Sequence, residues 1–152
     1  EWLNGGNCTK LPKMIGFQAA GSAPIVDGAP VAKPQTIATA IRIGNPASWQ
    51  SAIAARDESG GLIGKVTDDE ILEAYQMLAT LEGVFAEPAS AAPIAGIRKL
   101  AAAGYFADYD GATVAVTLTG HGLKDPDRAI KTAAQWPTVP ATLDAVARVL
   151  GY

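Results

Sequence analysis

The chain has 152 residues, of which 49% are hydrophobic and 18% charged, with a formal net charge of −3 and a mean hydropathy of +0.15. This length suits one domain with a sizeable core, and the mild negative charge argues against nucleic acid or an anionic membrane as a partner. A single cysteine, Cys8, excludes an internal disulfide framework, and a single histidine, His121, excludes a metal site built from two or three histidines of this chain. Apolar runs fall short of the roughly 20 residues that a membrane helix needs, and no signal peptide is visible, so we expect a cytoplasmic protein with a reduced Cys8 thiol.

The first 61 residues predict an alternation of strands and helices. Residues 13–19 (KMIGFQA) indicate a short buried strand, and residues 21–24 (GSAP) indicate the entry to a helix. Residues 36–43 come next, and we interpret 41–46 (IRIGNP) as the end of a strand. Asn45 and Pro46 then predict the N-cap and first position of a helix that stops at glycines 60 and 61.

The middle of the chain repeats this alternation. Residues 62–66 indicate a strand, and residues 67–70 (TDDE) form a capping box in front of an amphipathic helix that ends near Gly83. Residues 84–86 predict another short strand, followed by a helix that Ser90 caps and that runs to about Ala103. Residues 112–118 (ATVAVTL) carry the strongest strand pattern of the chain, because they are rich in β-branched residues and bounded by glycines.

Two further helices are predicted near the end, one from Asp125 and Pro126 and one capped by Thr142, joined by a rigid link at 136–140 (WPTVP). Strands that alternate with helices predict an α/β fold with a mainly parallel sheet and helices on both faces. We expect residues 112–118 to be an interior strand of that sheet, and an exposed segment there would count against this fold class.

Candidate functional residues lie where predicted strands end, since ligands of open parallel sheets bind beyond the carboxyl ends of the strands. Thr119 leads into Gly120-His121-Gly122, and its hydroxyl can both donate and accept a hydrogen bond. Glu87 enters a helix, where the helix dipole favours a carboxylate. Each has an ordinary structural explanation: Thr119 can end a strand, His121 can shape a turn, and Glu87 can serve the helix start.

Four stretches of the chain together resemble the shorter, bacterial type of threonine synthase, in that family's order: GFQAAG at 16–21, TIATAIRIGNPASW at 36–49, EPASAA at 87–92 and TLTGHGLKD at 117–125. The resemblance implies a large domain similar in fold to the tryptophan synthase β subunit and a pyridoxal 5'-phosphate cofactor. It implies a lyase of amino-acid biosynthesis that converts O-phosphohomoserine and water to L-threonine and phosphate.

The resemblance also assigns roles to residues of this chain. Thr119 matches a hydroxyl residue that faces the pyridine nitrogen, Ala40 and Ile41 match positions that line the cofactor ring, and Glu87 matches a carboxylate near the ring. We expect the turn at 120–122 and the segment 41–44 to open to the same side and line one cavity. A hydroxyl against the nitrogen, in place of a carboxylate, would leave the nitrogen largely unprotonated.

Some of the family's parts have no counterpart among these 152 residues. None of the seven lysines matches the motif of the Schiff-base lysine, so we expect no catalytic residue in this chain, and both that lysine and the small domain to lie upstream. Residues 1–152 would then be the carboxyl-terminal portion of the large domain. Its expected partners are O-phosphohomoserine, the missing amino-terminal part and a second copy in a homodimer.

Two alternatives stay open at this point. A threonine or serine dehydratase relative shares the fold, although the stretch 119–122 speaks against it. A truncated chain without turnover is the second alternative.

Overall fold

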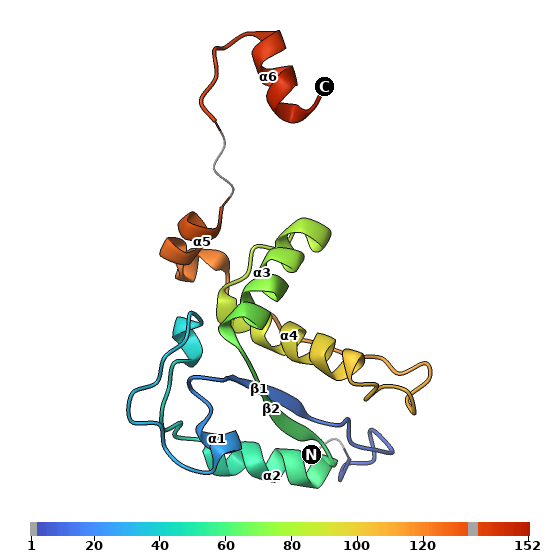
Figure 1. Cartoon of the computed structure of the whole chain (residues 1–152). Helices are drawn as coiled ribbons and strands as arrows, with labels where there is room; N and C mark the ends of the chain where they lie inside the picture. The colour runs from blue at the N-terminus through green and yellow to red at the C-terminus, as the bar shows by residue number, and fades with distance from the viewer. Residues whose placement is uncertain (1–2, 134–136) are drawn as a thin grey trace.

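The computed structural model describes residues 3–133 and 137–152, and its centre is a parallel pair of strands. Strand β1 (Ile15–Ala19) pairs with β2 (Leu62–Val66) in register from Ile15 opposite Leu62 to Ala19 opposite Val66. Helices α1 (Pro24–Asp27) and α2 (Trp49–Ser59) pack against β2 from one side, and α4 (Pro88–Ala102) packs against both strands from the other (Figure 1). The predicted α/β class, with parallel strands and helices on both faces, is confirmed.

The junction between β2 and α3 (Asp68–Glu82) follows its local sequence closely. The Thr67 side chain accepts a hydrogen bond from the Glu70 backbone N–H, and the Glu70 carboxylate accepts one from the Thr67 N–H, so the predicted capping box is present. At the other end, Gly83 has a φ of 66°, a left-handed conformation that glycine adopts at low cost. Local hydrogen bonding therefore sets both ends of α3 where the sequence predicts them.

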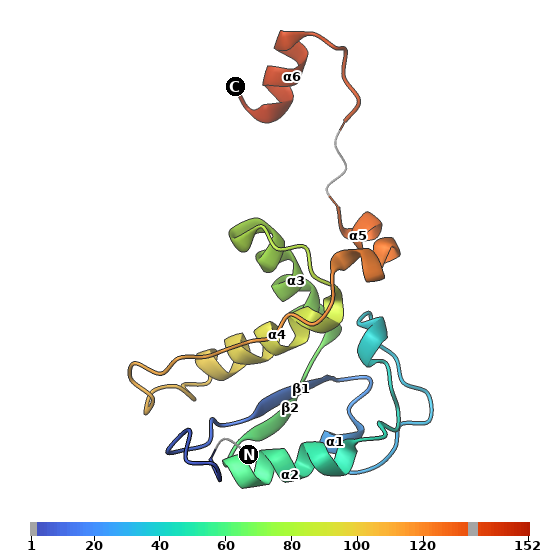
Figure 2. The same ribbon diagram turned by 180° about the vertical axis from the view of Figure 1, so that it is seen from behind.

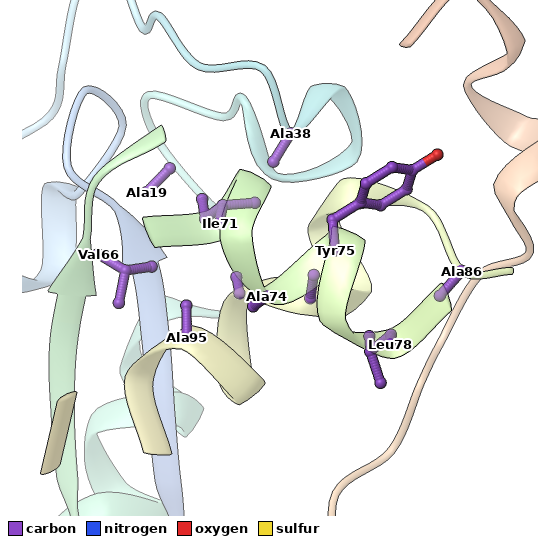
Figure 3. Packing of buried hydrophobic residues seen from close by; sticks show 11 residues of the cluster. Ala19, Ala38, Val66, Ile71, Ala74, Tyr75, Leu78, Ala86 and Ala95 are labelled. Atoms are coloured by element: carbon purple, nitrogen blue, oxygen red, sulfur yellow. The ribbon is translucent and has the colours of Figure 1, made fainter. Parts of the chain in front are cut away.

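The core lies where α3 and α4 meet the strands, and much of it is alanine. Figure 3 shows Val66, Ile71 and Ala95 in the region where β2, α3 and α4 meet; each is nearly or fully buried. Small side chains let helix and sheet approach closely, and at Gly96 of α4 the approach is such that an added Cβ would overlap the Phe17 ring. The other buried hydrophobic residues of this cluster are Ala19, Ala38, Ala74, Tyr75, Leu78, Ala86, Ala91 and Ala92.

The prediction that a strand ends at 41–46 is wrong, because residues 36–46 form a loop with one 3-10 turn, η1 (Thr39–Ile41). Asp68, at the start of α3, accepts hydrogen bonds from the Thr36 hydroxyl (2.5 Å) and from the Ile37 N–H (3.0 Å). The Ile37 N–H, a backbone group that a strand would use for pairing, is thus bonded to a helix terminus instead. The following helix, α2 (Trp49–Ser59), has its C-cap at Gly60 as predicted, but its N-cap is Ser48, three residues after the predicted cap at Asn45.

Two further predicted strands are also wrong. Residues 84–86 contribute a single antiparallel bridge, between Ala86 and His121, and residues 112–118 form no strand within the described chain. The second segment is largely exposed, with Val114 48% exposed, and the described sheet contains β1 and β2 alone. A strand is stabilised by a hydrogen-bonded neighbour, so a strong strand pattern without one stays an extended loop. The predicted α/β class still holds, because β1 and β2 pair in parallel.

Predicted caps place the last two helices correctly. Asp125 accepts a hydrogen bond from the Arg128 N–H at the start of α5 (Pro126–Thr132), and Thr142 does the same for the Ala145 N–H at the start of α6 (Leu143–Leu150). A 3-10 turn, η2 (Gly122–Lys124), precedes α5. Part of the predicted link at 136–140, Trp136, lies outside the described residues. Within the described residues, none of the helices is long and apolar enough to cross a membrane.

Candidate functional site

The turn at residues 119–122 is held against the beginning of α4 by backbone hydrogen bonds. The Glu87 N–H donates to the Gly120 carbonyl (2.9 Å), and the Gly122 N–H donates to the Phe85 carbonyl (3.0 Å). These bonds flank the bridge between Ala86 and His121. The structure therefore brings together two of the stretches that the sequence singled out, 87–92 and 117–125, at one end of α4.

Ser90 fastens the same turn through its side chain. Its Oγ accepts a hydrogen bond from the Gly120 N–H (2.8 Å) and lies 3.1 Å from the Thr119 Oγ1. Ser90 is 1% exposed, whereas Thr119 is exposed. The prediction that Ser90 caps α4 is wrong: Glu87 occupies the N-cap position and Pro88 the first turn, so the Ser90 hydroxyl is available for the turn.

Glu87 lies buried beside the turn. Glu87 is 3% exposed, and its Oε1 lies 3.3 Å from the Nζ of Lys124. The Lys124 side chain is itself largely exposed. A buried carboxylate is stabilised by a cationic partner of this kind, because burial otherwise disfavours the charge. The sequence proposed Glu87 as a site residue and gave no indication of Lys124 as its partner.

Glycines at 120 and 122 are required by close packing. A Cβ at Gly120 would overlap the Glu87 Oε1, and a Cβ at Gly122 would overlap the Phe85 ring. Any larger residue would therefore displace either the buried carboxylate or the aromatic ring. The two glycines explain how the turn comes so near to the first turn of α4.

His121 has a structural role in this arrangement. Its Nδ1 accepts a hydrogen bond from the Leu123 N–H (3.2 Å), and its ring meets the Phe85 ring edge to face, with centroids 5.3 Å apart. The acceptor nitrogen is thus used to begin η2. The structural explanation of His121 given from the sequence is the one that this geometry favours.

Ala40 and Ile41 lie in η1, which packs against α4; Figure 2 shows η1 beside the beginning of that helix. The buried Ser22 hydroxyl lies 3.2 Å from the Ile41 carbonyl and 3.1 Å from the Ile43 carbonyl, so it tethers this loop. The Thr39 hydroxyl donates to the Asp125 Oδ2 (3.2 Å), which ties η1 to the segment that follows the turn. The sequence analysis missed Ser22 and Asp125 as tethers, because their partners are 19 to 86 residues away along the chain.

Ala40 is exposed and Ile41 half-buried, while Thr119 and Glu87 flank the same end of α4. Two surface cavities lie elsewhere. One of about 180 Å³ lies between α1 and α2, with Trp49 in its wall, and one of about 210 Å³ lies between α3 and α4. That residues 41–44 and 120–122 line one cavity therefore stays a prediction.

These side chains are compatible with the cofactor contacts that the resemblance implies for them. Thr119 offers an accessible hydroxyl beside a buried partner, which can meet one ring nitrogen. The nearby carboxylate of Glu87 is buried and has Lys124 as its partner, whereas Thr119 is exposed and its hydroxyl can reach a ring nitrogen. Ala40 and Ile41 contribute small and apolar surface of the kind that packs against a ring.

Comparison with known proteins identifies the family. The family model described as "Pyridoxal-phosphate dependent enzyme" matches residues 3–120, which is most of the chain. The chain belongs to this family. The predicted membership in a family of pyridoxal-phosphate enzymes is thereby confirmed.

The curated relatives are threonine synthases. The chain is 52% identical over 151 residues to that of Mycobacterium leprae, covering 99% of this chain and 41% of the relative. It is 51% identical to that of Synechocystis, covering 97% and 38%, and 57% identical to that of Halalkalibacterium halodurans, covering 86% and 36%. The chain thus spans about two fifths of the length of the curated relatives it matches. Among solved structures, a T.th. threonine deaminase is 24% identical with a TM-score of 0.47, covering 58% of this chain and 34% of that one.

Proposed function

We propose that this chain is the carboxyl-terminal portion of the large domain of a pyridoxal-phosphate dependent threonine synthase. The whole enzyme would be a lyase that converts O-phosphohomoserine and water to L-threonine and phosphate. Identity of 51–53% to curated threonine synthases over 97–99% of this chain supports the proposal. The structural observation that carries it is the accessible Thr119 hydroxyl, held by buried Ser90 beside a carboxylate that is already paired.

The residues that would hold the cofactor in this proposal are Thr119, Ala40, Ile41 and Glu87. When bound, pyridoxal phosphate supplies an electron sink for the negative charge that develops on a substrate carbon. Thr119 would donate a hydrogen bond to the pyridine nitrogen, and Ala40 and Ile41 would line the ring and exclude water from it. Glu87, kept in its ion pair with Lys124, would set the position of the Gly120 backbone behind Thr119.

The rest of the catalytic apparatus would come from sequence that precedes these residues in the complete polypeptide. The Schiff-base lysine and the small domain belong to that part of the proposal, as do a homodimeric assembly and a cytoplasmic location. The share of each relative that this chain covers, 36–41% in the three relatives compared, supports a larger enzyme.

The test is the Thr119→Val variant of the complete enzyme, which keeps the shape of the side chain and deletes the hydroxyl. One lost hydrogen bond is worth about 0.5–1.5 kcal/mol, or up to about 3 kcal/mol when a buried polar atom loses its partner, so turnover should fall between about 2-fold and 100-fold. Cofactor retention should change less, because charge on the ring develops mainly in the transition state. Threonine and phosphate formation and cofactor absorbance after dialysis are measured together.

Thr117→Val serves as the matched control, since Thr117 is exposed and lies two residues earlier on the same segment. Unchanged turnover in Thr119→Val, with cofactor retained, would reduce Thr119 to a residue that shapes the turn. A wild-type enzyme that forms no threonine from O-phosphohomoserine would show that the proposed function is wrong.

A further inference from the structure

Three groups form a continuous hydrogen-bonded chain at the proposed cofactor site, which we name the Ser90 relay: the Gly120 N–H, the Ser90 hydroxyl and the Thr119 hydroxyl. The Gly120 N–H donates to the Ser90 Oγ at 2.8 Å, which uses one of the two lone pairs of that oxygen. The Ser90 hydroxyl has one proton of its own to place. Where that proton goes decides what Thr119 can offer a ligand.

Two acceptors lie near the Ser90 proton, and their distances differ. The Thr119 Oγ1 is 3.1 Å away, and the Gly120 carbonyl oxygen is 3.4 Å away. Hydrogen bonds between oxygens are usually about 2.5–3.0 Å long, so the longer contact is the weaker one. The Gly120 carbonyl already accepts the Glu87 N–H at 2.9 Å, whereas the Thr119 oxygen gains its buried partner only from Ser90. Either hydroxyl can be the donor of the Ser90–Thr119 pair, and the shorter distance favours Thr119 over the Gly120 carbonyl as the acceptor of the Ser90 proton.

We infer that Ser90 is a positioning residue that sets the Thr119 hydroxyl as an outward hydrogen-bond donor, and so selects an unprotonated ring nitrogen. With one lone pair of Thr119 occupied by the Ser90 proton, its own proton points away from Ser90, toward the exposed side of the turn. Hydrogen bonds in a chain polarise one another in the same direction, which makes Thr119 a better donor and a poorer acceptor. This inference rests on the proposed function and adds the residue that gives Thr119 its direction.

The burial of Ser90 fits this role. The residue is 1% exposed, on the first turn of α4, and its own N–H donates to the Glu87 carbonyl at 3.0 Å. Neither its backbone nor its hydroxyl is free to change partner with solvent. The charged pair beside the turn joins Glu87 and Lys124 without using the side chain of Ser90 or Thr119, so we expect the variants below to change the relay and leave the nearby charges in place.

The first part of the test needs no cofactor. Ser90→Ala removes the acceptor of the Gly120 N–H, and hydrogen exchange of that amide, measured by NMR, should become about 3- to 10-fold faster for the loss of one hydrogen bond. The Gly122 N–H, which donates to the Phe85 carbonyl, is the internal reference. Ser59→Ala is the matched control, because the Ser59 Oγ accepts the Met14 N–H (3.0 Å) away from the site. Unchanged exchange at Gly120 would overturn the relay.

The second part uses the complete enzyme loaded with pyridoxal phosphate that carries ¹⁵N in the ring. In the wild type, the ¹⁵N shift should be that of an unprotonated nitrogen at neutral pH. Ser90→Ala should move the protonation equilibrium of this nitrogen about 3- to 10-fold toward the protonated form, and Thr119→Val should move it at least as far. Ser59→Ala should leave it unchanged.

The double variant Ser90→Ala/Thr119→Val decides whether Ser90 acts through Thr119. It should give the same ¹⁵N shift as Thr119→Val alone, because no hydroxyl remains for Ser90 to orient. If Thr119→Val changes the ¹⁵N shift and Ser90→Ala leaves it at the wild-type value, the relay is wrong and the proposed function still stands. The relay would also be wrong if Ser90→Ala changed the ¹⁵N shift equally in the wild type and in Thr119→Val. A wild-type enzyme that retains no pyridoxal phosphate would overturn both.

Discussion

The junction of β2 with α3 and the segment 112–118 carry equally clear local patterns, yet only the first forms the structure that its pattern predicts. At the junction, Val66 at the end of β2 is fully buried in the cluster that α3 and α4 form with the strands, and Thr67 caps the helix that follows. At 112–118, alternating β-branched residues remain exposed and unpaired among the described residues. A capping box makes both of its hydrogen bonds within four consecutive residues, whereas a strand needs hydrogen bonds to a neighbouring strand from elsewhere in the chain.

The largest effect should come from truncating the same residue type in both regions. Val66→Ala removes two buried methyl groups and should lower the free energy of unfolding by about 2–3 kcal/mol, as measured by urea denaturation. Val114→Ala, at a position that is 48% exposed, should cost less than about 0.5 kcal/mol. Equal losses at the two positions would mean that 112–118 is packed as a strand in solution, and the comparison would fail.

An intermediate effect is expected at the helix start. Thr67→Ala removes the side chain that accepts the Glu70 N–H and should cost about 1 kcal/mol of unfolding free energy. Thr80→Ala on the same helix is the control, because the Thr80 hydroxyl bonds back to the Gln76 and Met77 carbonyls of its own helix and alanine is the better helix former. A loss at Thr80 as large as at Thr67 would show that the capping box does not set the beginning of α3.

The smallest effect concerns pH at the same junction. Burial raises the pKa of Glu70, but hydrogen bonds from the Thr67 N–H and the Lys99 ammonium outweigh it, so the pKa lies below its ordinary value of 4.5. A lowered pKa in the folded state contributes stability above the ordinary value, and that stability is lost as the pH falls through the folded pKa. Because the pair is partly exposed, the contribution should be no more than about 0.5 kcal/mol.

Urea midpoints of wild type and Glu70→Gln, compared from neutral pH to below the ordinary pKa of 4.5, measure this contribution. The two curves should differ at neutral pH and converge as Glu70 becomes protonated. Lys99→Met should shrink the difference, since it removes the cation 3.0 Å from the carboxylate. Curves that stay parallel at all pH values would contradict the assignment.

Much of the candidate site could be predicted, but not its internal contacts. The stretches that contain Glu87 and Thr119 were singled out from the sequence, and the structure joins them at the first turn of α4. Their contacts could not be predicted, because Ser90 reaches Gly120 across 30 residues and Lys124 reaches Glu87 across 37. Such pairs leave no periodic signal in one sequence. That Thr119, Ala40, Ile41 and Glu87 contact the cofactor stays a prediction.

By itself the sequence determined the elements whose hydrogen bonds close locally: the box at Thr67, the caps at Asp125 and Thr142, the glycine stops at Gly60 and Gly83, and the two short apolar strands. Only the tertiary structure decided the state of segments whose polar groups need distant partners. Residues 36–43 form a loop because Asp68 and Ser22 bind their backbone and side-chain groups. Ser90 can bind the turn at 119–122 because Glu87 and Pro88, and not Ser90, occupy the N-cap and first position of α4. The physical reason is that a backbone N–H or carbonyl takes the partner that the fold brings within reach, whatever its local propensity.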